Sequence, residues 1–390
     1  MHEKEERSKE MDKFEIVIPT IFGLEAFTSR EVRSLGYETS LVEDGRITFW
    51  GDMKAVCRSN LWIRTGERIL IKIAEFEAKT FDELFEKTKS VSWDEWIGKD
   101  CAFPVTGYSL KSKLASVRDC QAIIKKAIVD SLSSKYSITH FEETGVMYQI
   151  RFSILKDRVT LMLDASGEPL HKRGYRAISN AAPLKETIAA AMVMMSHWKY
   201  EYPLADPLCG SGTIPIEAAM IKRNIAPGLL RNFAAQNFLQ CPIELWNECK
   251  EEAESLKKDV PLEIFASDID AKTIEIAKKN AYLAGVGDVV IPKVLDVADF
   301  SSQLSYGTVI CNPPYGERLG DEKMCKKLYA DMGRTFSKLD KWSYYILTSN
   351  EEFENIFAKK ANKKRKIYNG MLKCNIYQYF GPKPPMPQKS

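Results

Sequence analysis

Apolar and polar residues in the N-terminal part of the chain follow the spacing of short strands and amphipathic helices. Over residues 12–66 the pattern predicts a strand, a helix, a hairpin that reverses at Asp44-Gly45, and a second helix. Over residues 67–166 strands and helices are mixed again, and two alternating apolar runs near the end predict another hairpin. Each block therefore predicts a small α+β domain.

The pattern changes after these two blocks. Residues 167–181 combine glycine, proline and basic residues, and we interpret them as a linker. Residues 182–390 alternate short apolar runs with helical periodicity, which predicts a mostly parallel, doubly wound α/β sheet. A final hairpin, reversing at Asn369-Gly370, should add antiparallel strands to the edge of that sheet.

Composition narrows the possible functions. The net charge is only +3, so a nucleic-acid surface must be a local patch. Nine scattered cysteines form no CxxC pair and four histidines show no ligand spacing, which disfavours a metal centre. No apolar run reaches membrane-spanning length, and residues 1–11 are too polar for a signal peptide. We expect a disordered leader over these residues and a soluble, cytoplasmic protein with reduced thiols.

A glycine-rich turn follows the first predicted strand of the α/β domain, in the sequence ADPLCGSGT (205–213). Glycines between a strand and a helix let a ligand approach the backbone and the free N–H groups of the helix start. A P-loop would require a lysine that is absent, and Pro215 replaces the third glycine of a dinucleotide fingerprint. An S-adenosylmethionine loop and an ordinary strand–helix turn remain. The candidate cofactor residues are Asp206, Pro207, Cys209, Gly210, Ser211, Gly212 and Thr213.

Acidic residues also end the next two predicted strands. Asp268 could accept hydrogen bonds from both hydroxyls of a ribose, and Ile269 lies beside it as a further candidate cofactor residue. Asp270 is better explained as the cap of the following helix. Asp296 could bind an adenine amino group, but a solvated loop aspartate explains it equally well.

The fourth strand of this domain breaks into the sequence NPPYGERL (312–319), where two prolines cannot continue a sheet ladder. The Asn312 side-chain oxygen and the Pro313 carbonyl offer two neutral acceptors to the N–H groups of a planar exocyclic amine. Such a pair orients the amine towards a methyl donor without a strong base. Pro314 would rigidify the segment and Tyr315 would stack on the base. These catalytic candidates fit guanine N2 and adenine N6 alike, and a plain strand-to-loop turn is the alternative.

Basic residues suited to phosphate contacts gather in two stretches. One begins before the predicted helix at 115–136 and runs along it, and the other lies in the linker. Phosphate contacts supply affinity without reading a base sequence. A solvated helix face is the alternative for the first stretch. The candidate nucleic-acid-binding residues are Lys111, Lys113, Arg118, Lys125, Lys172, Arg173 and Arg176.

Together these motifs resemble those of the THUMP-domain class I RNA methyltransferases. DPLCGSGT, SDID, NPPYGERL, LHKRGYR (170–176) and APLKE (182–186) carry the resemblance, which covers about residues 12–381. NPPY alone is shared by many amino-methyltransferases, including adenine-N6 DNA enzymes, so the combination makes the resemblance specific. The chain is most similar to the bacterial group that methylates guanine N2 in 23S ribosomal RNA.

The resemblance implies a ferredoxin-like domain at 12–66, a THUMP RNA-binding domain at 67–166 and a class I methyltransferase (Rossmann-like) domain at 182–390. It implies S-adenosylmethionine as methyl donor, lined by the glycine loop, with Asp268 on the ribose and Asp296 at the adenine. It also implies that the NPPY residues hold a flipped guanine and that the partner is RNA.

Three alternatives to an enzyme acting on ribosomal guanine stay open. These are an adenine-N6 DNA methyltransferase, a tRNA guanine-N2 methyltransferase and a non-catalytic RNA-binding assembly factor. Some members of the resembled family carry a second methyltransferase domain after the first. Because this chain ends at residue 390, we do not expect that second activity.

Overall fold

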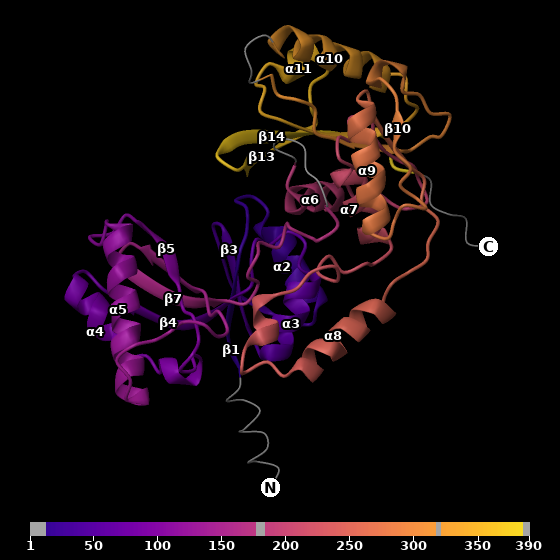
Figure 1. Cartoon of the computed structure of the whole chain (residues 1–390). Coiled ribbons are helices and arrows are strands. Elements are labelled where there is room, and N and C mark those ends of the chain that lie inside the picture. Colours follow the sequence, from indigo (N-terminus) through magenta and orange to yellow (C-terminus); the bar gives the residue numbers. More distant parts are fainter. Residues whose placement is uncertain (1–12, 177–183, 317–320, 385–390) are drawn as a thin grey trace. The chain divides into compact units, whose positions relative to one another are not determined.

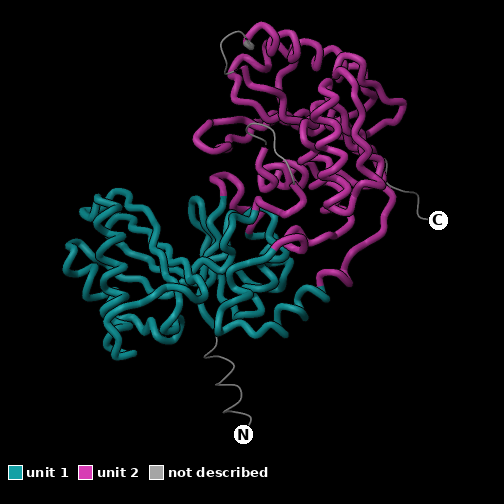
Figure 2. Tube along the Cα trace, viewed as in Figure 1, with its two compact units in different colours: residues 1–20, 29–170, 232–252 teal, residues 21–28, 171–231, 253–390 magenta. Residues whose placement is uncertain are grey.

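The computed structural model describes residues 13–176, 184–316 and 321–384, and the chain forms two compact units (Figure 2). Unit 1 comprises residues 1–20, 29–170 and 232–252, and unit 2 comprises residues 21–28, 171–231 and 253–390. The leader expected at 1–11 lies outside the described residues. Within the described ranges, no helix has the length and apolar character needed to cross a membrane.

Unit 1 is built on a seven-stranded sheet with the order β2-β3-β1-β4-β7-β6-β5. The two predicted α+β blocks share this sheet, because β1 pairs with β4 and β4 pairs with β7. The predicted reversal at Asp44-Gly45 is confirmed, since it joins β2 to β3. The strands are β1 Phe14–Pro19, β2 Thr39–Glu43, β3 Arg46–Gly51, β4 Leu70–Glu77, β5 Val105–Leu110, β6 Ile150–Leu155 and β7 Arg158–Asp164.

Side-chain caps define where several helices of the N-terminal half begin. Asp52 accepts the N–H of Ala55 at the start of α3, and Ser116 accepts the N–H of Asp119 at the start of α5. Each such cap contributes about 1 kcal/mol by satisfying an N–H that the helix leaves unpaired. The helices of the N-terminal half are α2 Glu25–Ser34, α3 Met53–Trp62, α4 Phe81–Lys89, η1 Trp93–Glu95 and α5 Val117–Tyr136. Two further helices lie within residues 232–255, and these are η2 Ala234–Asn237 and α8 Ile243–Ser255.

Unit 2 contains a second seven-stranded sheet, with the order β10-β9-β8-β11-β12-β14-β13. Figure 1 labels β10 and the β13–β14 hairpin of this sheet. The pairings from β10 to β12 are parallel, and β14 runs antiparallel to both β12 and β13. The predicted mostly parallel sheet with a terminal antiparallel hairpin is therefore confirmed. The strands are β8 Leu204–Asp206, β9 Ile264–Asp268, β10 Lys293–Val294, β11 Thr308–Cys311, β12 Ser343–Thr348, β13 Lys363–Asn369 and β14 Leu372–Tyr379.

The terminal hairpin reverses one residue later than predicted. β13 ends at Asn369 and β14 begins at Leu372, so Gly370 and Met371 are the two turn residues. Gly370 has φ +65°, which a two-residue turn requires at its first central position. The sequence Asn-Gly favours a turn centred on those two residues, but the pairing of Asn369 with Leu372 sets the actual register.

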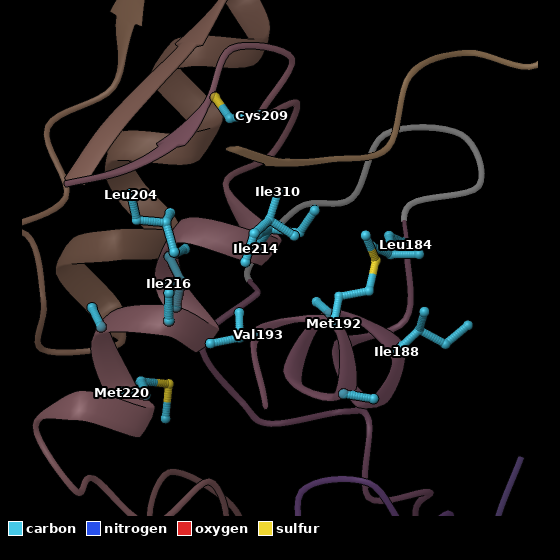
Figure 3. Close-up of a cluster of buried hydrophobic side chains, with 14 of the residues drawn as sticks. Leu184, Ile188, Met192, Val193, Leu204, Cys209, Ile214, Ile216, Met220 and Ile310 are labelled. Atoms are coloured by element: carbon cyan, nitrogen blue, oxygen red, sulfur yellow. The ribbon is translucent and has the colours of Figure 1, made fainter. Parts of the chain in front are cut away.

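The core of unit 2 lies where α6 and α7 pack against the sheet. α6 reads ETIAAAMVMMS, and every residue except Met194 is buried. Figure 3 shows side chains of α6, α7, β8 and β11 gathered in one apolar cluster. Each fully buried aliphatic side chain contributes about 1.5–3 kcal/mol, so this cluster holds α7 firmly against β8. The helices are α6 Glu186–Ser196, α7 Thr213–Lys222, α9 Ala271–Leu283, η3 Val297–Asp299, α10 Asp321–Phe336 and α11 Phe353–Ile356.

Gly174 offers a test of how the 170–176 segment is packed. Its φ is +102°, and a Cβ added there would lie 2.3 Å from the carbonyl oxygen of Leu230. Gly174→Ala is expected to lower the free energy of unfolding by about 2–4 kcal/mol, because strain and overlap add. Chemical unfolding of the full chain measures this loss.

Gly285→Ala is the matched control for that substitution. Gly285 also has a positive φ, +71°, but no atom lies within 4 Å of an added Cβ. Its loss should be limited to the conformational cost of about 1–2 kcal/mol. Equal losses in the two variants would contradict the close packing of Gly174 on Leu230.

Candidate active site

The carboxyl ends of β9, β8 and β11 meet at one edge of the unit 2 sheet. β8 pairs in parallel with β9 on one side and with β11 on the other. Asp206 ends β8, Asp268 ends β9, and Asn312 follows β11 directly. Open α/β sheets bind their ligands at this edge. The structure therefore brings three motifs that are far apart in the sequence to the same edge.

The glycine loop after β8 is shaped by two residues with positive φ. Gly210 has φ +52° and its N–H donates to Asp268 Oδ2 at 3.0 Å. Gly212 has φ +85°, and a Cβ there would lie 3.3 Å from that of Ala277 in α9. A Cβ at Gly210 would meet no protein atom within 4 Å. Gly212 is thus explained by packing, whereas open space faces Gly210. The other predicted loop residues are buried: Pro207, Cys209, Ser211 and Thr213.

The two aspartates at this edge have different surroundings. Asp206 is 1% exposed, and its Oδ1 accepts the N–H of Leu208 at 3.2 Å. Burial, reinforced by the charge of Asp268, raises the pKa of Asp206 well above its ordinary value. Asp268 accepts the N–H of Gly210 with one oxygen and the N–H of Asp270 with the other, at 3.0 Å each. An ionised Asp206 is costly, so the site favours a cationic or hydrogen-bond-donating group beside it.

The remaining acidic candidates lie at the same edge. Asp270 begins α9 and accepts the N–H of Lys272 at 3.0 Å, so its predicted capping role is confirmed. Asp296 follows β10 and begins η3 in the same way, accepting the N–H of Ala298 at 2.9 Å. Ile269 is 68% exposed and presents an apolar side chain beside Asp268.

The NPPY segment is held by internal hydrogen bonds. The Tyr315 hydroxyl donates to Asn312 Oδ1 at 2.6 Å, and the Tyr329 hydroxyl donates to the Pro314 carbonyl at 2.7 Å. Pro313 is buried and Asn312 is half-buried. A carboxamide oxygen has two lone pairs, so Asn312 Oδ1 keeps one acceptor position beyond the bond from Tyr315.

Tyr315 differs from the free stacking platform that its sequence position suggests. The side chain packs against the apolar core of unit 2, and burial raises the pKa of its hydroxyl. Its bond to Asn312 fixes the orientation of the amide, which is a positioning role. Sequence spacing could not reveal this bond, nor the contact of Tyr329 from α10 with Pro314.

Arg173 is the clearest correction to the predicted nucleic-acid contacts. It is 2% exposed, and its Nε lies 3.2 Å from Glu217 Oε1 in α7. The Tyr175 hydroxyl donates to the same oxygen at 3.3 Å. The prediction that Arg173 contacts RNA is therefore wrong, because its guanidinium is enclosed in the core. A basic residue beside a glycine looks the same in the sequence whether it points inwards or outwards.

Arg176 also makes internal contacts, and these reach the glycine loop. Its Nη2 donates to Thr213 Oγ1 at 2.7 Å and lies 3.0 Å from Glu186 Oε1. Thr213 is the first residue of α7, directly after Gly212. Arg176 of the LHKRGYR motif thereby contacts both Glu186 of the APLKE motif and the start of α7. In the sequence these two motifs carried only the family resemblance, and their spacing did not predict this contact.

The basic residues predicted on unit 1 divide into two groups. Lys125 pairs with Glu143, donates to the Phe103 carbonyl at 3.1 Å and lies 3.4 Å from the centre of the Phe103 ring. These contacts tie it to its own unit. By contrast, the side chains of Lys111, Lys113 and Arg118 are exposed where β5 ends and α5 begins. Lys172 is exposed in unit 2.

Three protein families match successive parts of this chain. Residues 15–70 match the RlmL ferredoxin-like domain, and residues 78–164 match the THUMP domain. Residues 173–378 match the UPF0020 family, described as RMKL-like, methyltransferase domain.

Two curated proteins are similar over nearly the whole chain. "Putative RNA methyltransferase YpsC" of Bacillus subtilis (strain 168) is 48% identical over 97% of this chain and 99% of its own length. The ribosomal RNA large subunit methyltransferase K/L of Psychromonas ingrahamii is 34% identical over 94% of this chain. The match spans 50% of that longer protein.

Solved structures share the fold closely. The crystal structure of SMU.472 complexed with SAH is 42% identical, with a TM-score of 0.90, over 96% of this chain and 100% of the other. A Listeria monocytogenes protein described as a predicted N6-adenine-specific DNA methylase is 49% identical, with a TM-score of 0.91. That match covers 96% of this chain and 98% of the other.

Glu186 beside the glycine loop allows a test by pH. Burial outweighs the charge of Arg176 and raises the pKa of Glu186 to about 7 from 4.5. Between these values the folded protein holds a proton that the unfolded chain has lost. The stability that this proton contributes is therefore present below pH 4.5 and is lost as the pH rises to 7.

Glu186→Gln is expected to remove this loss of stability between pH 4.5 and 7. The free energy of unfolding should then decline less between pH 4.5 and 7, by up to about 3 kcal/mol. Urea unfolding at a series of pH values measures the difference from the unchanged chain. The control variant Glu244→Gln, at an exposed position of α8, should keep the original profile. Identical profiles for the original chain and Glu186→Gln would contradict the assignment.

Proposed function

The chain belongs to the THUMP-containing, RlmL-like RNA methyltransferases, and on this basis we propose that it methylates the exocyclic N2 of a guanosine in large-subunit ribosomal RNA. The observation that carries the proposal is Asn312, held by Tyr315 at the ligand-binding edge of the sheet. The Psychromonas relative, named as a ribosomal RNA large subunit methyltransferase, supports the choice of RNA.

S-adenosylmethionine is the methyl donor of this methyltransferase, and the related SMU.472 was solved with the demethylated product SAH. The residues at the sheet edge fit this cofactor. The open space at Gly210 admits a ligand against the backbone, and the buried Asp206 favours a cationic group. We propose that Asp268 and Ile269 bind the ribose side and that Asp296 binds the adenine. The bound cofactor supplies an electrophilic methyl group on a sulfonium.

Asn312 and Pro313 are proposed to hold the target amine. The free acceptor position of Asn312 Oδ1 and the Pro313 carbonyl would each accept one N–H of the amine. With both hydrogens held in the plane of the base, the nitrogen lone pair stands perpendicular to that plane, where it can face the methyl group. The acceptors also stabilise the positive charge that develops on nitrogen as the bond to carbon forms. Tyr315 and Tyr329 keep the segment in one geometry.

RNA binding is proposed for unit 1, whose residues match the THUMP family. A cavity of about 590 Å³ on its sheet is lined by Arg46, Arg68, Tyr108 and Arg151 over apolar Leu70. Tyr108, 55% exposed, suits base stacking. Arg46 pairs with Glu43, and Arg68 and Arg151 share Asp164, so only part of the guanidinium charge is left for phosphates. The exposed side chains of Lys111, Lys113 and Arg118 add positive charge to the same unit.

The proposed domains are residues 12–66, 67–166 and 182–390, and residues 167–181 are the proposed linker.

Adenine N6 is the second candidate target, because the Listeria relative is described as a predicted N6-adenine-specific DNA methylase. Both amines present two N–H groups in the plane of a base, so the same acceptors would serve either. The THUMP match favours RNA over DNA. Product analysis as N2-methylguanosine or N6-methyladenosine separates the two.

Asn312→Ala tests the role of the amide. Methyl transfer to ribosomal RNA from cells lacking the gene is expected to fall by about 10²–10³-fold or more, because the oriented acceptor is lost. Cofactor binding, measured by calorimetry, should remain. Tyr315→Phe keeps the ring but loses the bond to Asn312, so a smaller loss is expected. Full activity of Asn312→Ala would overturn the catalytic assignment.

Gly210→Ala tests the cofactor loop. An added methyl group would occupy the open space assigned to the cofactor, so S-adenosylmethionine affinity should fall by about tenfold or more. Gly285→Ala, with a similarly positive φ and open surroundings, is the control for backbone strain. The two variants should lose similar stability, and only Gly210→Ala should lose affinity. An unchanged S-adenosylmethionine affinity in Gly210→Ala would contradict the placement of the cofactor against Gly210.

A further inference from the structure

The tip of the β13–β14 hairpin lies at the sheet edge that holds the NPPY segment. β12 runs parallel to β11, which Asn312 follows directly, and the last residue of β12, Thr348, pairs with Asn375 near the start of β14. Because β14 is antiparallel to β12, the turn before Leu372 reaches the carboxyl edge of the sheet. Tyr315, which orients Asn312, and Leu372 both pack against the core of unit 2.

Met371 at this tip is exposed to a degree that packing does not explain. Its side chain is 100% exposed, more than any other large apolar side chain in the described ranges. The hairpin beneath it is rigid, because every residue of β13 is paired with β14 and Ile367, Cys374 and Ile376 are fully buried. An exposed apolar side chain thus projects from a well-paired hairpin at the sheet edge that holds the candidate catalytic segment.

The strands below the tip carry positive charge. Lys363 and Lys366 are exposed on β13, which is the edge strand of the sheet. Lys373 on β14 has 53% of its side chain exposed, and its Nζ lies 3.8 Å from Glu351 Oε1. Edge lysines also prevent strand pairing, but that role does not call for an exposed methionine at the turn. The apolar side chain at the tip would suit contact with stacked bases, and the lysines on the strands below it would suit contact with the phosphates on either side.

We propose that the β13–β14 hairpin is an RNA-contacting wedge. In it, Met371 inserts beside the target base while Lys366 and Lys373 contact the adjacent phosphates. The inference rests on the proposed function, in which the target base leaves its stack to reach Asn312. Unstacking a base costs a few kcal/mol, and an inserted apolar side chain offsets that cost. Because Leu372 and Tyr315 pack against the same apolar core, the wedge and the acceptor amide share one support.

The test compares two RNAs that carry the same target nucleotide, located beforehand with the unchanged enzyme. In one RNA the target is base-paired within a helix, and in the other it is unpaired and lies between two abasic sites, so that it has neither a pairing partner nor a stacking neighbour. Met371→Ala is expected to lower kcat/KM about tenfold to hundredfold on the paired RNA. On the unstacked RNA its rate should stay within about threefold of the original. Met371→Leu, which keeps an apolar side chain of similar volume, should retain activity on both.

Controls separate the wedge from folding and from the proposed function. Met147→Ala changes a 58% exposed methionine of unit 1. The difference between its losses of rate on the two RNAs should be smaller than the difference for Met371→Ala. Thermal midpoint and S-adenosylmethionine affinity of Met371→Ala should equal those of the original chain, since the side chain has no packing to lose. No loss, or an equal loss on both RNAs, would overturn the wedge while leaving the proposed function intact. If the unchanged enzyme methylates no guanosine when the target is sought in ribosomal RNA, the proposed function is overturned and the wedge with it.

Discussion

The parallel pairing of β8 with a strand on each side is the constraint on which the candidate site depends. β8 has only three residues, Leu204–Asp206, and all of them are buried. Its register against β9 and β11 places Asp206, Asp268 and Asn312 at one sheet edge. Strands this short are held by side-chain burial more than by their own hydrogen bonds, and the cluster under α6 and α7 supplies it. The chemistry at the edge thus rests on an apolar core that has no chemical role of its own.

The 173–176 segment connects that core to the glycine loop. Removing the charges of Arg173 and Glu217 from water costs several kcal/mol, which close pairing offsets only when the geometry is good. Tyr175 adds a hydrogen bond to the same carboxylate, and Arg176 reaches Thr213 at the start of α7. These arginines therefore act on the loop conformation from inside the protein.

Much of the fold could be predicted because local patterns and tertiary structure agree. The Asp44-Gly45 turn, the Asp270 cap and the mostly parallel sheet all follow from short-range rules. The inward direction of Arg173 and the bond from Tyr315 to Asn312 could not be predicted, because both depend on partners supplied by the tertiary fold. The shift of the terminal turn to Gly370-Met371 has the same origin, since pairing across the sheet outweighed the turn preference of Asn-Gly.

The central claim is that the amide of Asn312 receives the N2 amine of a ribosomal guanosine. The most direct measurement is mass mapping of methylated nucleosides in 23S ribosomal RNA and tRNA. The RNA would come from cells with the gene, without it, and with the Asn312→Ala form. We predict that one N2-methylguanosine of 23S ribosomal RNA is present only with the unchanged gene. An unchanged N2-methylguanosine pattern, or loss of N6-methyladenosine in its place, would contradict the claim.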